Sequence, residues 1–200
     1  MPGGKAPPEP WVREYYAKFA PERAASFNIK NLGNPVLFGA IVPEVFCPNL
    51  VRVGTVLDGG KYVCNPRLIP ENCSIYSLGI DNEISFDKAI QEFNNFTCKI
   101  YGYDKATTNN VTLSEYEKIN GKIEKLELAS KTNASANEYF LGDLVQRNND
   151  TFVEILKMDV EGQEHDSLVP FLQKYDVCQV LVEIHGTAES HVSLLRSIAK

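Results

Sequence analysis

The sequence predicts an α/β fold built on a doubly wound, mostly parallel sheet. After Cys73, the 200-residue chain alternates between short apolar segments and amphipathic segments, a pattern typical of β-α-β units. Apolar residues make up 44% of the chain and charged residues 23%, which are ordinary values for a globular protein. The longest apolar runs span only a few residues, whereas a membrane-spanning helix needs about 20. We therefore expect a packed core and no membrane span.

Five β-rich segments are expected to form the sheet, with a strand order near 3-2-1-4-5. They are residues 74–80, 99–104, 122–128, 152–160 and 179–186. The helix-like segments between and after them are residues 85–93, 138–147, 163–175 and 188–199.

Residues 1–44 are expected to form an N-terminal extension, and residues 45–200 a single domain. The Gly- and Pro-rich start of the chain indicates a flexible lead-in, followed by a short helix over residues 11–19. Prolines make residues 26–50 look irregular. The Asp58-Gly59-Gly60 sequence between two β-rich runs predicts a hairpin.

The charge balance argues against a nucleic-acid partner. The chain has 20 basic and 26 acidic residues, a net charge of −6 and a pI near 5.2. Proteins that bind nucleic acids present a basic face to the phosphates. We expect no nucleic-acid partner, and the sequence does not predict the oligomeric state.

Glycosylation sequons favour a secretory or extracellular location. Chance would give about 1.5 sequons for 16 asparagines and 19 serines plus threonines, against five found. Their asparagines are Asn72, Asn95, Asn110, Asn133 and Asn149. The signal or anchor would then lie upstream of Met1, because the start of the chain has no apolar core of a signal peptide. Asparagine-rich loops in a cytoplasmic protein remain the alternative.

The five cysteines have no metal-ligand spacing, so we expect no metal site. Cys73 and Cys98 fall at the same level of two neighbouring predicted strands, which permits a disulfide. Cys47 and Cys64 flank the hairpin and form the expected second pair. Cys178 is expected to be a buried thiol outside the two bridges. Five reduced core cysteines are the alternative.

Residues that follow the first two strands suggest a cofactor site, since ligands bind beyond the carboxyl ends of parallel strands. Gly79 permits close backbone approach, and Asp104 follows it by 25 residues, near the spacing of about 20 for a ribose-binding acid. The glycine-rich dinucleotide motif is absent, and the nearby Asp81 would repel a diphosphate. A sulfonium cofactor tolerates this loop. A simple turn glycine and an exposed carboxylate are the alternatives.

The fourth and fifth strands end in groups that could move a proton. Asp159 and Glu161 share one side of the chain, as do Glu183 and His185. His185 is a candidate general base near neutral pH. An acidic helix N-terminus and a histidine with no role in catalysis are the alternatives.

Residues 155–164, Ile-Leu-Lys-Met-Asp-Val-Glu-Gly-Gln-Glu, resemble the signature of FkbM-type methyltransferases, and the resemblance extends over roughly residues 45–190. The segments 141–144 and 182–185 lie where that family has related segments. Residues 52–64 and 76–80 look like its animal methyltransferase-like branch.

The resemblance implies a Rossmann-like, class I methyltransferase fold that uses S-adenosylmethionine. It implies that Gly79, Asp104 and Asp143 lie on the cofactor side, and that Asp159, Glu161 and His185 line the transfer site. The chain ends before the terminal strand pair of that fold, so we expect an incomplete sheet.

Methyl transfer from S-adenosylmethionine to an oxygen is the leading function, with a small-molecule or glycan hydroxyl as the acceptor. Asp81 joins Gly79, Asp104 and Asp143 as a cofactor-side candidate. A non-catalytic secreted binding module that keeps the fold is the alternative. A nicotinamide oxidoreductase is disfavoured by the missing glycine motif.

Overall fold

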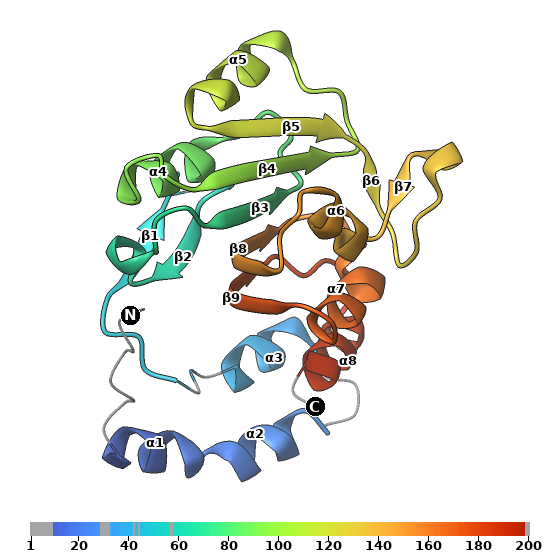
Figure 1. Cartoon of the computed structure of the whole chain (residues 1–200). Helices are drawn as coiled ribbons and strands as arrows, with labels where there is room; N and C mark the ends of the chain where they lie inside the picture. Colours follow the sequence, from blue (N-terminus) through green and yellow to red (C-terminus); the bar gives the residue numbers. More distant parts are fainter. Residues whose placement is uncertain (1–9, 29–32, 42, 44, 57, 199–200) are drawn as a thin grey trace. The chain divides into compact units, whose positions relative to one another are not determined.

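A five-stranded parallel sheet forms the centre of the fold, in the order β5-β4-β3-β8-β9 (Figure 1). The computed structural model describes residues 10–28, 33–41, 43, 45–56 and 58–198. The strands are β3 (Ser74–Leu78), β4 (Lys99–Asp104), β5 (Gly121–Lys125), β8 (Phe152–Met158) and β9 (Asp176–Val182). The predicted α/β class and the 3-2-1-4-5 order are confirmed.

Helices cover both faces of this sheet because the strand side chains alternate between two apolar clusters. Ile75, Ile100 and Ile155 are paired across neighbouring strands and pack in one cluster, while the paired Tyr76 and Leu156 belong to the other. The first cluster includes buried side chains of α4 (Ser85–Phe93) and α5 (Asn110–Lys118), the second those of α6 (Leu141–Arg147) and α7 (Glu164–Leu172). The sheet is therefore doubly wound.

An antiparallel hairpin and a small two-stranded sheet accompany the main sheet. The hairpin pairs β1 (Leu50–Val53) with β2 (Lys61–Cys64), as predicted, and is followed by η1 (Pro66–Leu68). The predicted strand 122–128 is divided between β5 and β6 (Glu127–Leu128), and β6 pairs with β7 (Glu138–Tyr139) after η2 (Ala134–Ala136). The sequence pattern did not predict α5, because only Thr112 and Tyr116 of that helix are buried.

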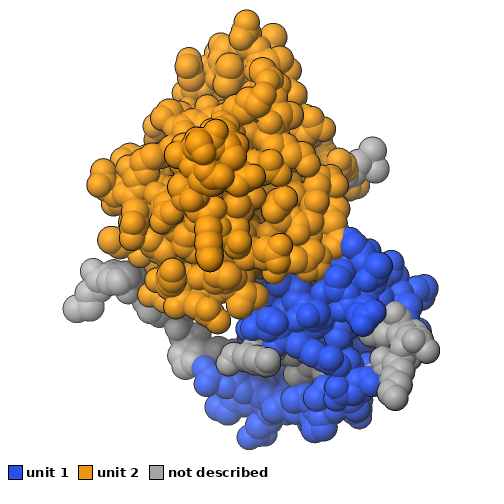
Figure 2. Space-filling model, turned by 90° about the vertical axis from the view of Figure 1, so that its right-hand side faces the viewer, with its two compact units in different colours: residues 1–48, 186–200 blue, residues 49–185 orange. Residues whose placement is uncertain are grey.

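Contacts divide the chain into two compact units, residues 49–185 and residues 1–48 with 186–200 (Figure 2). The second unit contains α1 (Pro10–Ala17), α2 (Ala20–Ser26), α3 (Asn34–Ala40) and α8 (Ala188–Ile198). Buried Leu37 of α3 packs with Ala188 and Val192 of α8. The expectation of irregular structure is wrong for α3. The predicted lead-in lies almost wholly outside the described residues, and none of the described helices is long and apolar enough to cross a membrane.

A disulfide joins Cys73 to Cys98, with 4.5 Å between the Cα atoms. Cys47 and Cys64 are disulfide-bonded as well. Cys178 lies on β9 and is exposed, so the expectation that it is buried is wrong. Residues along β9 alternate between exposed and half-buried at this end of the strand, which leaves its thiol on the outward side.

Candidate functional site

A cavity of about 360 Å³ opens at the carboxyl ends of the parallel strands, within the larger unit. The hairpin turn and the loops after β3, β4, β8 and β9 surround it. Eight carboxylates line it, against two lysines: Asp58, Asp81, Glu83, Asp104, Glu127, Asp159, Glu161 and Glu183, with Lys105 and Lys157. Its lining is therefore strongly acidic.

Gly79 brings the loop after β3 against the end of β8. Its φ is +76°, and a Cβ there would lie 1.6 Å from the carbonyl oxygen of Asp159. Only glycine fits this position without moving the backbone. Lys157, 2% exposed, donates a hydrogen bond from Nζ to the Gly79 carbonyl oxygen at 2.9 Å. The loop that we expected to approach a ligand is thus held in place from both sides.

Asp104 lines the cavity, but its carboxylate already accepts hydrogen bonds from three backbone amides. Oδ2 accepts from Ile80 N at 2.6 Å and from Asp81 N at 2.7 Å, and Oδ1 accepts from Ala106 N at 2.6 Å. Asp104 therefore shapes the loop after β3, and at most one of about four carboxylate acceptor sites is left for a ribose hydroxyl. Asp81 is exposed and also lines the cavity.

Asp143 does not belong to this cavity. It lies exposed in the first turn of α6, where its Oδ2 accepts a hydrogen bond from Thr132 Oγ1 at 2.6 Å. It is absent from the described residues that line the cavity. The implied cofactor-side place of Asp143 does not agree with this geometry.

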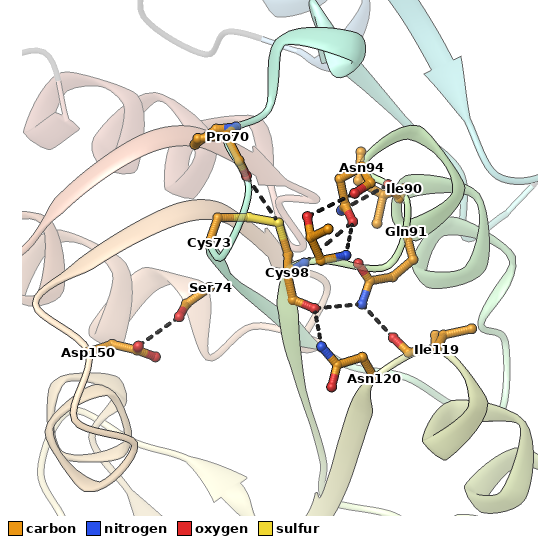
Figure 3. Close-up of a disulfide and its surroundings, with 11 residues drawn as sticks. Pro70, Cys73, Ser74, Ile90, Gln91, Asn94, Cys98, Ile119, Asn120 and Asp150 are labelled. Atoms are coloured by element: carbon orange, nitrogen blue, oxygen red, sulfur yellow. Dashed lines mark hydrogen bonds between the residues drawn. A yellow bond between two sulfur atoms is a disulfide. The ribbon is translucent and has the colours of Figure 1, made fainter. Parts of the chain in front are cut away.

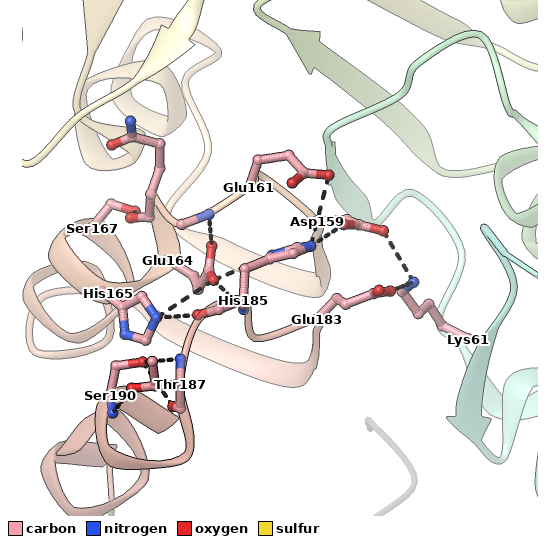
Figure 4. A network of polar contacts seen from close by, with 12 residues as sticks. Lys61, Asp159, Glu161, Glu164, His165, Ser167, Glu183, His185, Thr187 and Ser190 are labelled. Atoms are coloured by element: carbon pink, nitrogen blue, oxygen red, sulfur yellow. Dashed lines mark hydrogen bonds and ion pairs between the residues drawn. The ribbon is translucent and has the colours of Figure 1, made fainter. Parts of the chain in front are cut away.

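Asp159, Glu161 and His185 do come together, as the strand ends predicted (Figure 4). His185 Nε2 lies 3.6 Å from Asp159 Oδ1 and 3.8 Å from Glu161 Oε1. All three line the cavity. Glu161 has a φ of +55°, so the turn after β8 adopts a left-handed conformation to place it there.

Glu164 fixes the orientation of the His185 ring. It is completely buried, and its Oε1 accepts from His185 N at 2.7 Å and lies 3.3 Å from His185 Nδ1. Its Oε2 accepts from Gly162 N at 2.9 Å. Because a carboxylate accepts only, Nδ1 carries a proton toward Glu164, and Nε2 points toward Asp159 and Glu161.

Lys61 lies on β2 and contacts two residues of the site that follow it by 98 and 122 positions in the sequence. Its Nζ lies 3.3 Å from Asp159 Oδ2 and 2.8 Å from Glu183 Oε2. Sequence analysis did not single out Lys61 or the contact of Glu164 with His185. The sequence held a signal for each: Lys61 ends the Asp-Gly-Gly-Lys sequence of the hairpin, and Glu164 is the last residue of the 155–164 motif.

The ionisation of these groups reflects both burial and Lys61. Burial raises the pKa of Asp159, and the Lys61 charge offsets only part of that effect. The hydrogen bond from Lys61 lowers the pKa of Glu183. Burial alone would lower the pKa of Lys61, but its contacts with Glu183 and Asp159 outweigh burial and raise it.

Two groups of side chains in this region have the geometry of a cation site. One ligand atom each from Asp159, Glu161 and His185 lies within 4.8 Å of the others, and the same holds for Asp58, Asp159 and Glu183. Lys61 already places its ammonium group on two members of the second group. The expectation that the protein needs no metal stays a prediction.

Comparison with known proteins assigns the family. A family model described as a methyltransferase domain matches residues 18–197, nearly the whole chain. No curated protein matches the chain, and no solved structure does. The chain thus belongs to a methyltransferase domain family.

Proposed function

We propose that the protein transfers a methyl group from S-adenosylmethionine to a hydroxyl oxygen of a small molecule or glycan. The observation that carries this proposal is the orientation of His185. Its Nε2 faces Asp159 and Glu161 at the cavity, and the buried Glu164 lies against Nδ1.

The cofactor side of the proposal comprises Gly79, Asp81 and Asp104. Bound S-adenosylmethionine would supply an electrophilic methyl group on a positively charged sulfonium. The acidic lining suits that charge and disfavours a diphosphate. Gly79 has no side chain that would separate a ligand from its backbone.

On the acceptor side, His185 acts as the general base. Nε2 takes the hydroxyl proton as the oxygen–carbon bond forms and the carbon–sulfur bond breaks, with the bonding electrons returning to sulfur. Glu164 stabilises the resulting imidazolium through Nδ1, in the way a carboxylate orients a catalytic histidine. Asp159 and Glu161 orient the acceptor hydroxyl. The excess of carboxylates disfavours anionic acceptors such as phosphates.

Calorimetric titration with S-adenosylmethionine, S-adenosylhomocysteine and NAD tests the cofactor assignment. We expect binding of the two sulfur compounds and none of NAD. Transfer of labelled methyl groups to a panel of neutral sugars and small alcohols then tests the reaction. His185→Ala should lower turnover about 10²-fold or more while cofactor binding survives, and equal loss of binding would make His185 structural.

Glu164→Gln separates positioning from catalysis. The glutamine keeps an acceptor oxygen for Nδ1–H but removes the charge that stabilises the imidazolium. We expect a lower kcat, an unchanged cofactor Kd and a shift of the rising limb of the pH–rate profile to lower pH, because the imidazolium loses its partner and the ring gives up its proton more easily. A change in stability without a shift in the profile would contradict the positioning role.

A non-catalytic binding module with the same fold is the second candidate. The saturation of Asp104 by three backbone amides favours it, since this leaves little capacity for a ribose diol. A complete lack of S-adenosylhomocysteine binding in the titration above would select this candidate.

We also propose that the protein folds in the secretory pathway or outside the cell. Four of its five cysteines are disulfide-bonded, and cytoplasmic thiols are usually kept reduced. A cytoplasmic location is the alternative, and would leave these four cysteines reduced in protein isolated from cells.

A further inference from the structure

We propose that Asn72, Asn95 and Asn149 carry N-linked glycans that together cover the amino edge of the parallel sheet, opposite the cavity. The inference rests on the secretory location proposed above and is independent of the methyl-transfer chemistry. It assigns a modification to a surface formed by three loops that lie far apart in sequence.

The topology brings the three sequons together. Asn72 precedes β3, Asn95 precedes β4 and Asn149 precedes β8, each by two to four residues. These three strands are neighbours and run parallel, so their starts share one edge of the sheet.

Covalent and hydrogen bonds confirm this proximity (Figure 3). The Cys73–Cys98 disulfide joins the segment after Asn72 to the segment after Asn95. Ser74, the hydroxyl residue of the first sequon, donates to Oδ1 of Asp150, the central residue of the third, at 2.7 Å.

In each loop the asparagine is exposed, which leaves room for a bulky sugar. The hydroxyl residues of the first two sequons face the protein: Ser74 is 9% exposed, and Thr97 Oγ1 donates to Asn94 O at 2.8 Å. Since the Ser74 hydroxyl is engaged in the folded protein, modification of Asn72 precedes folding.

The competing explanation is that these asparagines serve only as turn residues. All three have a φ between +55° and +59°, a conformation in which asparagine is enriched. Asn120 has a φ of +57° at the start of β5, on the same edge, but lies in no sequon. It is therefore the matched control for a pure turn role.

Glycans at this edge leave the cavity open. β3, β4 and β8 are five to seven residues long, so roughly 16–23 Å separates their two ends. Asn110 and Asn133, the other two sequon asparagines, lie on connections that follow β4 and β6, and they are not part of this edge.

The test uses the full chain behind a cleavable secretion leader in animal cells. Enzymatic release of N-glycans in ¹⁸O-water converts each modified asparagine to labelled aspartate, which peptide mass spectrometry locates. We expect label at Asn72, Asn95 and Asn149. Secreted protein with both disulfides closed and none of the three labelled would overturn the proposal.

Glycine variants separate glycosylation from turn formation, because glycine keeps the left-handed conformation and removes the acceptor nitrogen. The apparent mass on a gel should fall by one glycan in each of Asn72→Gly, Asn95→Gly and Asn149→Gly. It should not change in Asn120→Gly. Enzymatic deglycosylation should leave S-adenosylhomocysteine affinity within about twofold if the ligand binds. A tenfold change would contradict placement away from the cavity, whereas absent binding with full labelling would reject only the proposed activity.

Discussion

The two edges of the central sheet differ in how their polar groups are paired. At the amino edge, Asp150 accepts from Ser74 and from Tyr76, each at 2.7 Å, and the Cys73–Cys98 disulfide links two strands covalently. At the carboxyl edge, eight carboxylates surround a cavity with far fewer cations.

The contacts at the amino edge therefore stabilise the fold, whereas the carboxyl edge presents charged groups to a ligand. Burial raises the pKa of Asp159 despite the neighbouring Lys61, so the carboxyl edge holds charge at a cost in stability. Such a cost is typical of binding and catalytic sites. Substitutions at the two edges should therefore have separable effects on stability and on ligand binding.

Gly79→Ala should have the largest effect on stability, since it pushes the loop after β3 away from the end of β8. The new Cβ would overlap Asp159 O, and the positive φ adds backbone strain, so we expect a loss of about 2–6 kcal/mol in unfolding free energy. Gly162→Ala is the control: its φ is +107° with nothing within 4 Å of the added Cβ. Urea unfolding measures both, and equal losses would contradict the close contact with Asp159.

Replacing Cys73 and Cys98 together by alanine should weaken the amino edge without affecting the cavity. The bridge closes a 25-residue separation, so its loss should lower the unfolding free energy by about 3–4 kcal/mol. Reduced wild-type protein should lose at least as much in urea, because reduction also opens the disulfide bonding of Cys47 and Cys64. S-adenosylhomocysteine affinity should not change, and a parallel loss of affinity would mean that the two edges are coupled.

Asp104→Asn tests whether this carboxylate serves the loop or a ligand. The NH₂ group of the amide would face a backbone N–H group that now donates to the carboxylate, so a hydrogen bond would be lost. We expect the unfolding free energy to fall by about 1.5–3 kcal/mol. Asp81→Asn, at an exposed position of the same loop, should leave stability within about 0.5 kcal/mol. Lost affinity at unchanged stability in Asp104→Asn would show that the side chain contacts only the ligand.

Lys61→Met should raise the pKa of Asp159 further and return that of Glu183 toward its ordinary value. Because Lys61 lowers the folded-state pKa of Glu183, this pair adds stability above the ordinary value of 4.5 and loses it as the pH falls. The Glu183 side chain is 47% exposed, so the cost at pH 7 should be only about 1 kcal/mol.

The difference in unfolding free energy between wild type and Lys61→Met should become smaller from pH 7 to pH 4. Protonation of Asp159 also removes the cost of burying its charge. Urea unfolding at the two pH values measures this difference. Lys61→Arg, which keeps the charge, is the control. A difference that grows at low pH would contradict this assignment of the ion pairs.

Most strands of the sheet were predictable because β3, β4, β8 and β9 each lie in a short stretch rich in apolar residues and are each followed by a helix. The hairpin followed from Asp58-Gly59-Gly60 for the same local reason. By contrast, α5 buries too few side chains for its sequence to show apolar residues at helical spacing. Local patterns therefore predicted the sheet better than its peripheral helices.

The carboxyl edge was predictable only as a set of strand ends. Asp159, Glu161 and His185 meet because parallel strands align their carboxyl ends. The contacts of Lys61 depend on where a hairpin about 100 residues away packs, and the three amides that bind Asp104 depend on the loop conformation. No local spacing encodes either of these contacts.

Asp143→Ala should have the smallest effect. The residue was a cofactor candidate only through the family resemblance, and it is exposed and bonded to Thr132 outside the cavity. Loss of one exposed hydrogen bond should change the unfolding free energy by no more than about 0.5 kcal/mol, and S-adenosylhomocysteine affinity should be unchanged. A calorimetric loss of affinity beyond threefold, at wild-type stability, would place Asp143 on the cofactor side and extend the ligand site from the carboxyl edge to the start of α6.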